Sequence, residues 1–300
     1  MLTRLGLTLL SISLLLTSCT PGSRSQESAE GSHDMGVKAN YQARLGSEFE
    51  PIGTQIGAFN LPRRVRHTPT GIVLILVDPG TFMMGTPLSE KHRDRDEEQH
   101  IVTIDTSFYL GETEVTVSQW KQIMGPGPER LPDNGELPIG GVTWYRAQEF
   151  VKRLNQSGES GWRLPKEAEW EYACRAGTTT AFSFGEDITP EQVNYNGKRP
   201  YLSKKRGLDR NAPVPVRSLP PNPWGFYEMH GNLWEWCEDL YLKHPARDTL
   251  PQDTTGLSRV MRGGGFPSRG KQARSGYRDG YPPRSPGPKY GFRIAKTIGE

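Results

Sequence analysis

The side chains best suited to chemistry in this 300-residue chain are three cysteines and a concentration of basic residues. Cys19 ends an apolar N-terminal segment, whereas Cys174 and Cys237 lie well inside the sequence. In an exported protein such a pair either forms a disulfide or remains as two buried thiols. The spacing leaves both outcomes open, because disulfide geometry cannot be read from a sequence.

Basic residues concentrate between Arg259 and Lys296. This segment holds ten Lys or Arg and one acid, so it carries +9 in a chain of net charge +3 and leaves −6 elsewhere. The asymmetry indicates either an anionic ligand for the segment or pairing with the acidic remainder of the chain. Four central residues, with Lys271 beside them, are candidates to line a groove for an anionic or peptide ligand: Ser268, Arg269, Arg274 and Arg278.

Common catalytic signatures are missing from the sequence. It contains no GxSxG, HExxH, Walker or dinucleotide-binding motif, and its six histidines are scattered. These absences argue against a serine hydrolase with a nucleophile elbow, a metalloprotease and a nucleotide-binding protein. No nucleic-acid partner is expected.

The N-terminus has the features of an export signal. Arg4 precedes a mostly apolar run over residues 5–16, which is shorter than the roughly 20 residues that span a bilayer. Leu16-Thr17-Ser18-Cys19 resembles the bacterial lipobox, which implies cleavage before Cys19 and a lipid on its thiol. The alternative is an ordinary signal peptide with an incidental cysteine. The resemblance predicts a lipid-anchored protein of the bacterial envelope, in the outer rather than the inner membrane of a Gram-negative cell.

The remaining chain predicts one loop-rich domain. Its 34 Gly and 25 Pro disfavour helix interiors, and residues 20–45 lack apolar periodicity, as a flexible tether does. We therefore divide the chain into a signal peptide (1–18), a lipidated cysteine with its lead-in (19–67) and a domain (68–297).

Apolar spacing and capping residues predict the elements that position these side chains. Residues 71–77 are predicted to form a buried strand with 81–85 as its hairpin partner. Residues 89–98 are predicted to form a solvated charged loop. Helices are expected to begin near Thr116, Thr143 and Lys166. Further strands are expected at 101–104, 108–110, 214–216, 259–262 and 291–295.

Five segments resemble, in order and spacing, the formylglycine-generating enzyme (sulfatase-modifying factor) family. They are GTFMMG (80–85), LGETEVT (110–116), GWRLPKEAEWEYA (161–173), GFYEMHGNLWEW (225–236) and a closing set from RGG (262–264) to GFR (291–293). The resemblance covers residues 68–297. It implies a single α+β domain, related to the C-type lectin fold, with little regular secondary structure. In such a domain Arg163, Arg278 and Arg293 are expected to hold loops together through carboxylates and carbonyls.

The parent activity of that family is the oxidation of a sulfatase cysteine to formylglycine, with O₂ and a copper ion held by two thiolates. The family carries these cysteines after the Arg-Gly-Gly motif, where residues 265–273 read GFPSRGKQA. Ser268 lies near one expected position, but a hydroxyl does not replace a thiolate on Cu(I). We therefore expect no copper and predict a binding or accessory lipoprotein. Its ligand would be a protein, peptide or glycan of the envelope, held in the former active-site groove.

Two other functions remain open on the same scaffold. One is an enzyme with different, non-copper chemistry on a peptide or anionic substrate. The other is a sulfatase-cysteine oxidase. The missing cysteines argue against the oxidase and say nothing about the non-copper enzyme.

Residues 228–235 resemble the family's calcium loop. The resemblance implies calcium ligands from the side chains of Glu228 and Glu235 and from the carbonyls of Gly231 and Leu233. A second calcium site is implied at Asn194, Tyr195 and Asp209. Carboxylates mixed with carbonyls suit Ca²⁺, which takes six to eight hard oxygen ligands. The alternative for Glu235 is an ion pair with a core arginine such as Arg262 or Arg278.

Overall fold

The computed structural model describes residues 41–125, 132–243, 249 and 256–299. The predicted signal peptide, Cys19 and most of the tether lie outside the described residues. Within the described part of the chain, no helix combines the length and apolar character needed to cross a membrane.

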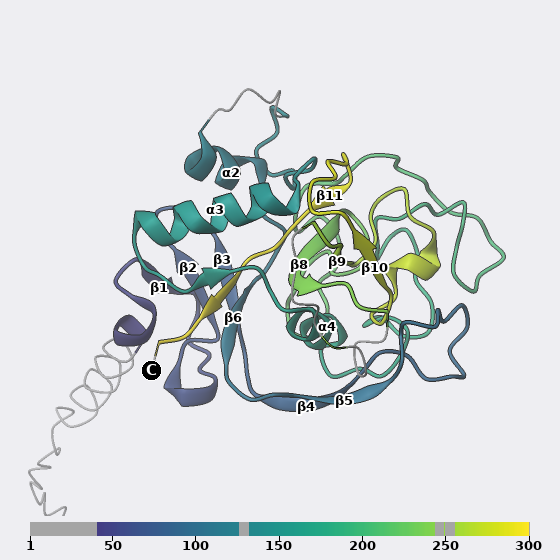
Figure 1. Ribbon diagram of the computed structural model, residues 1–300, viewed down its shortest axis with the longest axis horizontal. Coiled ribbons are helices and arrows are strands. Elements are labelled where there is room, and N and C mark those ends of the chain that lie inside the picture. Colours follow the sequence, from purple (N-terminus) through teal and green to yellow (C-terminus); the bar gives the residue numbers. More distant parts are fainter. Residues whose placement is uncertain (1–40, 126–131, 244–248, 250–255, 300) are drawn as a thin grey trace, which may run out of the picture.

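The largest sheet has six strands and is antiparallel throughout (Figure 1). Its strands follow the spatial order β1, β2, β3, β6, β12 and β7. Their bounds are Phe49–Pro51 (β1), Arg64–His67 (β2), Val73–Val77 (β3), Phe108–Gly111 (β6), Ala295–Thr297 (β12) and Trp162–Arg163 (β7). The C-terminal strand β12 thus lies between strands from the middle of the sequence.

A second sheet has the order β10, β9, β8, β11, and a separate hairpin pairs β4 with β5. Their bounds are Arg278–Tyr281 (β10), Arg259–Arg262 (β9), Trp234–Leu240 (β8), Tyr290–Gly291 (β11), Gly80–Met84 (β4) and His100–Ile104 (β5). The hairpin corrects one expectation, because residues 81–85 do not pair with β3. Both edges of β3 are already bonded, to β2 and to β6, so β4 must find another partner.

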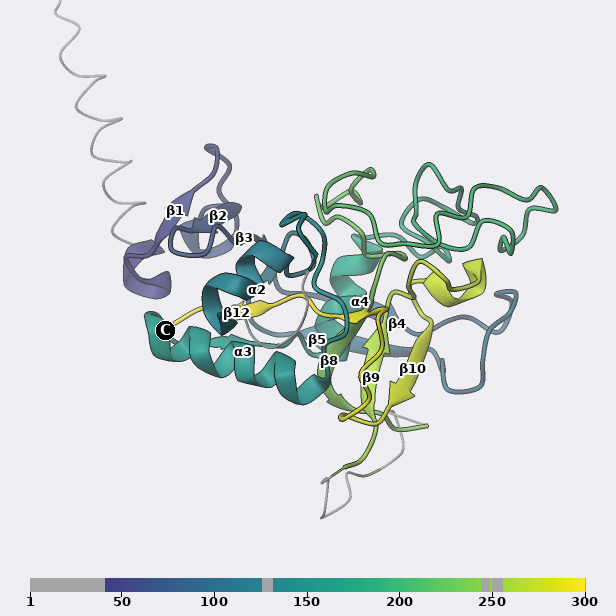
Figure 2. The ribbon, with the colours of Figure 1, turned by 90° about the horizontal axis from the view of Figure 1, so that it is seen from above.

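Three helices begin where they were predicted: α2 (Val117–Met124), α3 (Trp144–Ser157) and α4 (Glu167–Arg175). Thr116 caps α2 by accepting a hydrogen bond from Gln119 N, and Gln119 reciprocates, which completes a capping box. Figure 2 shows α2 and α3 together on one side of the molecule and α4 beside the second sheet. Two short 3₁₀ turns, η1 (Ala58–Asn60) and η2 (Gly270–Ala273), complete the elements.

The ordered domain begins before residue 68. Residues 41–45 are helical, and Tyr41, Leu45 and Phe49 are buried in the same core as α3. Since β1 and β2 also belong to the main sheet, the C-terminal half of the predicted lead-in is part of the fold.

Long irregular segments cover the second sheet, as the Gly and Pro content predicts. Residues 176–233 contain no helix or strand, and the strand expected at 214–216 is absent there. In that region Val214 N donates to Asn232 Oδ1 and Val216 N to Glu136 O, so side-chain and loop acceptors replace a strand partner. The observed fold is the single α+β domain with little regular structure that the sequence implied.

Candidate functional site

Most arginines of the basic segment are buried in ion pairs with carboxylates from distant parts of the chain. The pairs are Arg262 with Glu171, Arg274 with Glu97 and Glu90, Arg278 with Glu167, and Arg293 with Glu235. Arg163 likewise pairs with Glu169. The expectation that arginines hold the loops together is confirmed, and pairing within the chain accounts for most of the charge asymmetry.

Arg274 holds the loop formed by residues 86–99. Its fully buried guanidinium donates to both carboxylate oxygens of Glu97 at 2.7 Å, to Glu90 at 2.7 Å and to the carbonyl of His92 at 2.9 Å. Glu97 is itself only 1% exposed, so the loop expected to be solvated at 89–98 is anchored in the interior through Glu97. A buried arginine requires such partners, because leaving it unpaired would be strongly destabilising.

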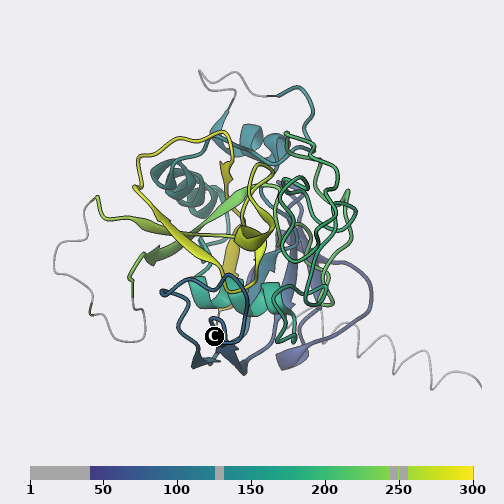
Figure 3. The same cartoon turned by 90° about the vertical axis from the view of Figure 1, so that its right-hand side faces the viewer.

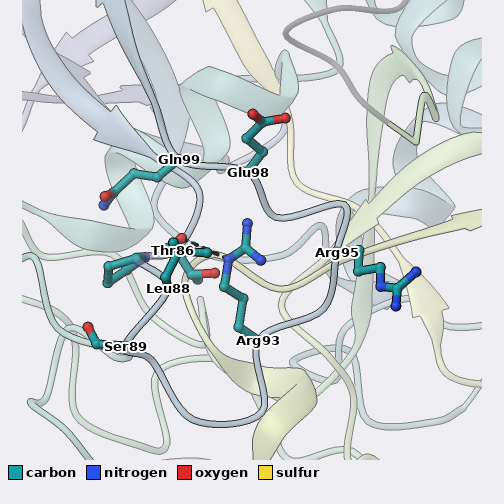
Figure 4. Close-up of a pocket in the computed structure, with 8 residues that line it drawn as sticks. Thr86, Leu88, Ser89, Arg93, Arg95, Glu98 and Gln99 are labelled. Atoms are coloured by element: carbon teal, nitrogen blue, oxygen red, sulfur yellow. Dashed lines mark hydrogen bonds between the residues drawn. The ribbon is translucent and has the colours of Figure 1, made fainter.

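A surface depression of about 840 Å³ is formed by this same loop (Figure 4). Figure 4 shows Arg93 extending toward Thr86, where its Nε donates to the Thr86 carbonyl at 3.1 Å. Leu88 on its rim is 89% exposed. Because one loop supplies every lining residue, the depression brings no side chains together from distant segments.

A smaller pocket of about 370 Å³ does combine distant segments, and we call it the basic pocket. Its lining residues are His92, Arg199, Pro200, Tyr201, Arg269 and Lys271. They come from the 86–99 loop, from an irregular segment near residue 200 and from the start of η2. Figure 3 shows η2 in yellow near the centre of the view with the green irregular segments beside it.

Local contacts hold the three walls of the basic pocket together. The Tyr201 hydroxyl donates to the Lys91 carbonyl at 2.7 Å, and the Tyr201 ring meets the His92 ring edge-on at 5.5 Å. Gly270 N donates to the Arg199 carbonyl at 3.0 Å. A Cβ at Gly270 would lie 2.7 Å from Tyr201 N, so only glycine permits this approach of the two segments.

The cations of the basic pocket are available to a ligand. Arg199 and Arg269 are exposed, and within the described part of the chain neither side chain forms an ion pair. Lys271 pairs with Asp94 at 3.5 Å and lies over the Tyr277 ring at 5.9 Å. These side chains differ in this respect from Arg262, Arg274, Arg278 and Arg293, whose charges are already compensated.

The four residues predicted to line a groove are not brought together as one surface. Arg274 and Arg278 are buried in ion pairs, and Ser268 is 5% exposed, with its hydroxyl accepting from Gly265 N at 2.9 Å. Arg269 lines the basic pocket, with Lys271 beside it. His92, Arg199 and Tyr201 were missed, because no sequence pattern placed them near Arg269.

Cys174 and Cys237 are both free and fully buried, so the structure contains no disulfide between them. Cys174 nevertheless lies closer to the 265–273 interval than its sequence position suggests. Its Sγ is 3.7 Å from His230 Nε2, and His230 Nδ1 donates to the Ala273 carbonyl at 2.7 Å.

This arrangement resembles a nucleophile beside a base, since Ser183 Oγ also lies 2.9 Å from His230 Nε2. Burial raises the pKa of Cys174 to about 12 and lowers the pKa of His230 to about 4. Without a bound metal the thiol therefore stays protonated at neutral pH, and nucleophilic attack by Cys174 lacks the thiolate it needs. The adjoining cavity, about 10 Å³, is no larger than one water molecule requires.

The proposed calcium ligands fit an observation that is independent of the sequence. Ten buried side-chain polar atoms in the described residues have no hydrogen-bond partner, and three of them are carboxylate or amide oxygens. These three are Glu228 Oε1, Asn194 Oδ1 and Asp209 Oδ1. All three belong to residues implied as calcium ligands. A buried oxygen without a donor is costly, and a cation would compensate it.

The charges around Glu228 also favour a bound cation. Glu114, Glu228 and Glu235 are buried near one another and interact with the buried cation Arg293, and Arg217 also acts on Glu228. Burial raises the pKa of Glu228 to about 7, and burial together with the charges of Glu235 and Glu228 raises that of Glu114. Bound calcium would add positive charge to that of Arg293 and Arg217.

Glu235 has the alternative partner that the sequence left open, although a different one from those named. Arg293 donates to both of its carboxylate oxygens, at 2.6 and 2.8 Å, and Trp170 Nε1 adds a third bond at 2.8 Å. No group of three His, Cys, Asp or Glu side chains in the described ranges is arranged to hold a metal. A calcium site here would therefore depend on carbonyls such as those of Gly231 and Leu233.

The family of this fold is shown by comparison with known proteins. The family described as the sulfatase-modifying factor enzyme 1-like domain matches residues 59–298, and the chain belongs to it. This chain is similar in structure to PvdO from Pseudomonas aeruginosa, with a TM-score of 0.68 at 25% sequence identity. The similarity covers 81% of this chain and 99% of the PvdO chain.

Curated relatives carry different functional names. A serine/threonine-protein kinase, pkn1 of Chlamydia caviae, is 36% identical over 78% of this chain, which spans only 39% of that protein. The chaperone protein LppX of Paenibacillus barcinonensis is 28% identical over 75% of this chain and 89% of its own length. An inactive Cα-formylglycine-generating enzyme 2 of Mus musculus is 32% identical over 60% of this chain and 55% of that protein. Membership of the family therefore does not determine an activity.

Proposed function

We propose that this protein is a lipid-anchored, non-oxidase member of the family that binds a ligand through an anionic group. The basic pocket is the binding site, and Arg199, Arg269 and Lys271 supply the charges. One observation carries the proposal: these cations are left without strong carboxylate partners, whereas the neighbouring arginines are buried and paired.

Two observations argue against the thiol chemistry of the parent enzyme. Residues 265–273 contain no cysteine, and burial keeps the pKa of both Cys174 and Cys237 above the usual range. The same burial argues against a different cysteine-dependent or serine-dependent enzyme at His230. A binding role requires none of these groups to ionise.

Two further features belong to the proposal. The lipobox-like sequence at Cys19 would anchor the domain in the bacterial envelope, where LppX, a relative named as a chaperone, offers a precedent for an accessory role. Calcium would act structurally, held by Glu228, Glu235 and the Asn194 segment. It would compensate the unpartnered buried oxygens of Glu228, Asn194 and Asp209.

Calorimetric titration with inorganic phosphate tests the basic pocket, using a chain that starts at residue 20. The double variant R199Q/R269Q should bind phosphate roughly 10- to 100-fold more weakly, since each removes a charge-assisted hydrogen bond. K152Q, which changes an exposed lysine outside the pocket, should bind like the unmodified protein. Equal binding by all three proteins would refute the proposal.

The oxidase alternative needs a separate assay. The protein is incubated with copper, oxygen and a cysteine-containing sulfatase peptide, and the peptide mass is followed. We expect no conversion of cysteine to formylglycine. Conversion in a protein freed of contaminating oxidase would replace a binding role with the parent activity.

A further inference from the structure

A second concentration of positive charge lies beside the basic pocket. Five exposed cations occupy residues 198–206, and no acidic residue lies between them: Lys198, Arg199, Lys204, Lys205 and Arg206. We call this segment the basic loop. Within the described chain only Lys198 of the five forms an ion pair, with Asp209 at 3.2 Å.

The basic loop is held in place at its base. Gly207 N donates to the Gly197 carbonyl at 2.7 Å, and Gly197 N donates to the Leu208 carbonyl at 3.2 Å. The carboxylate of Asp187 accepts from Ser203 N at 2.9 Å and from Leu202 N at 3.3 Å. These bonds hold five like charges in one segment, next to the carboxylates of Asp187 and of Glu191, which interacts with Lys205. A bound anion would further relieve the repulsion among the five cations.

The basic loop and the basic pocket are continuous. Arg199 belongs to both, and its carbonyl accepts from Gly270 N at the start of η2. Tyr201 joins the loop to residues 86–99 through its bond to the Lys91 carbonyl. In Figure 2 the green irregular segments lie beside the yellow η2 turn and the blue 86–99 loop. The cations therefore extend past a pocket that suits one anionic group.

We propose that the basic pocket and the basic loop together bind a linear polyanion, a chain of repeated phosphate or sulfate groups. This inference rests on the proposed function and extends it from one anionic group to a polymer. A polymer is favoured over an acidic protein because lysine is depleted at protein interfaces, which have an apolar centre. Here Lys204 and Lys205 stand with Arg206 at the exposed end of the loop.

Polyphosphate titrations at several salt concentrations test the inference. The variant K204Q/K205Q/R206Q should bind polyphosphate at least about 10-fold more weakly, and its salt slope should fall by about 2, because three counterion-releasing contacts are lost. Its affinity for inorganic phosphate should not change. The matched control K121Q/K152Q/K243Q removes the same charge from exposed positions outside both surfaces and should bind polyphosphate normally.

The outcomes separate this inference from the proposed function. If the loop variant and the control bind polyphosphate equally, the polymer site is refuted, although phosphate binding would still support the basic pocket. If R199Q/R269Q leaves polyphosphate binding unchanged, the two surfaces do not act together and the inference fails. Tighter, loop-dependent binding to phosphatidylglycerol vesicles than to polyphosphate would identify a membrane contact and overturn it. If the unmodified protein binds neither phosphate nor polyphosphate, the proposed function is refuted as well.

Discussion

Glu228 offers a quantitative test of the calcium proposal. Its side chain is buried at 6% exposure, one oxygen has no donor, and burial raises its pKa from 4.5 to about 7. Because the folded pKa lies above the unfolded one, the calcium-free protein loses stability as pH rises from about 4.5 through 7. The shift corresponds to about 3 kcal/mol in the free energy of unfolding, at 1.36 kcal/mol per pH unit.

Calcium should reverse this loss, because it favours the ionised carboxylate. At a concentration 100-fold above its dissociation constant, a ligand specific for the folded state adds about 2.7 kcal/mol. Glu228→Gln removes both effects, since the amide neither titrates nor supplies a charged ligand. The variant should therefore be more stable than the unmodified protein at pH 8 in chelator, and it should respond less to calcium.

Urea denaturation at pH 5 and pH 8, with calcium or with chelator, measures these differences. Subtracting E228Q from the unmodified protein cancels the titration of other groups, such as Asp239, whose pKa burial raises to about 6. Glu136→Gln, at an exposed carboxylate, is the matched control and should leave the pH dependence in place. Parallel stability profiles of E228Q and the unmodified protein, or an equal response to calcium, would refute the reasoning.

Three further predictions follow from buried or capping groups. Arg274→Ala leaves Glu97 buried without its partner and should lower the free energy of unfolding by roughly 3–5 kcal/mol in urea titrations; a loss under 1 kcal/mol would contradict the role of Arg274 in holding the loop formed by residues 86–99. Cys174 and Cys237 should react with a thiol reagent only after unfolding, so two rapidly reacting thiols in the native chain would contradict their burial. Thr116→Ala removes a capping box and should destabilise by about 1 kcal/mol, and an unchanged thermal midpoint would show that the cap contributes nothing.

The helices were predictable because their signals are local. Thr116 and Thr143 cap α2 and α3 through backbone groups three residues away, so the relevant partners lie in the same short segment of sequence. Strand pairing was less predictable. Residues 80–84 form a strand as expected, but their partner lies at 100–104, because β2 and β6 occupy the edges of β3.

The predicted calcium ligands and the residues of the basic pocket show the same contrast between local signals and distant contacts. The residues implied as ligands were named from local motifs, and Glu228, Asn194 and Asp209 were among them. Glu114 was missed as a neighbour, although it lies in the LGETEVT motif, because its contact with Leu233 N spans more than a hundred residues. His92, Arg199 and Tyr201 were missed for the same reason.

By itself the sequence determined the family, the α+β class, where the three helices begin and the absence of cysteine from residues 265–273. Tertiary structure decided which cations of the basic segment are available. Arg274 and Arg278 are neutralised by Glu97 and Glu167 from far along the chain, whereas Arg269 remains exposed at the basic pocket. The physical reason is that desolvation and ion pairing depend on which distant segments meet, and a one-dimensional charge count contains no such information.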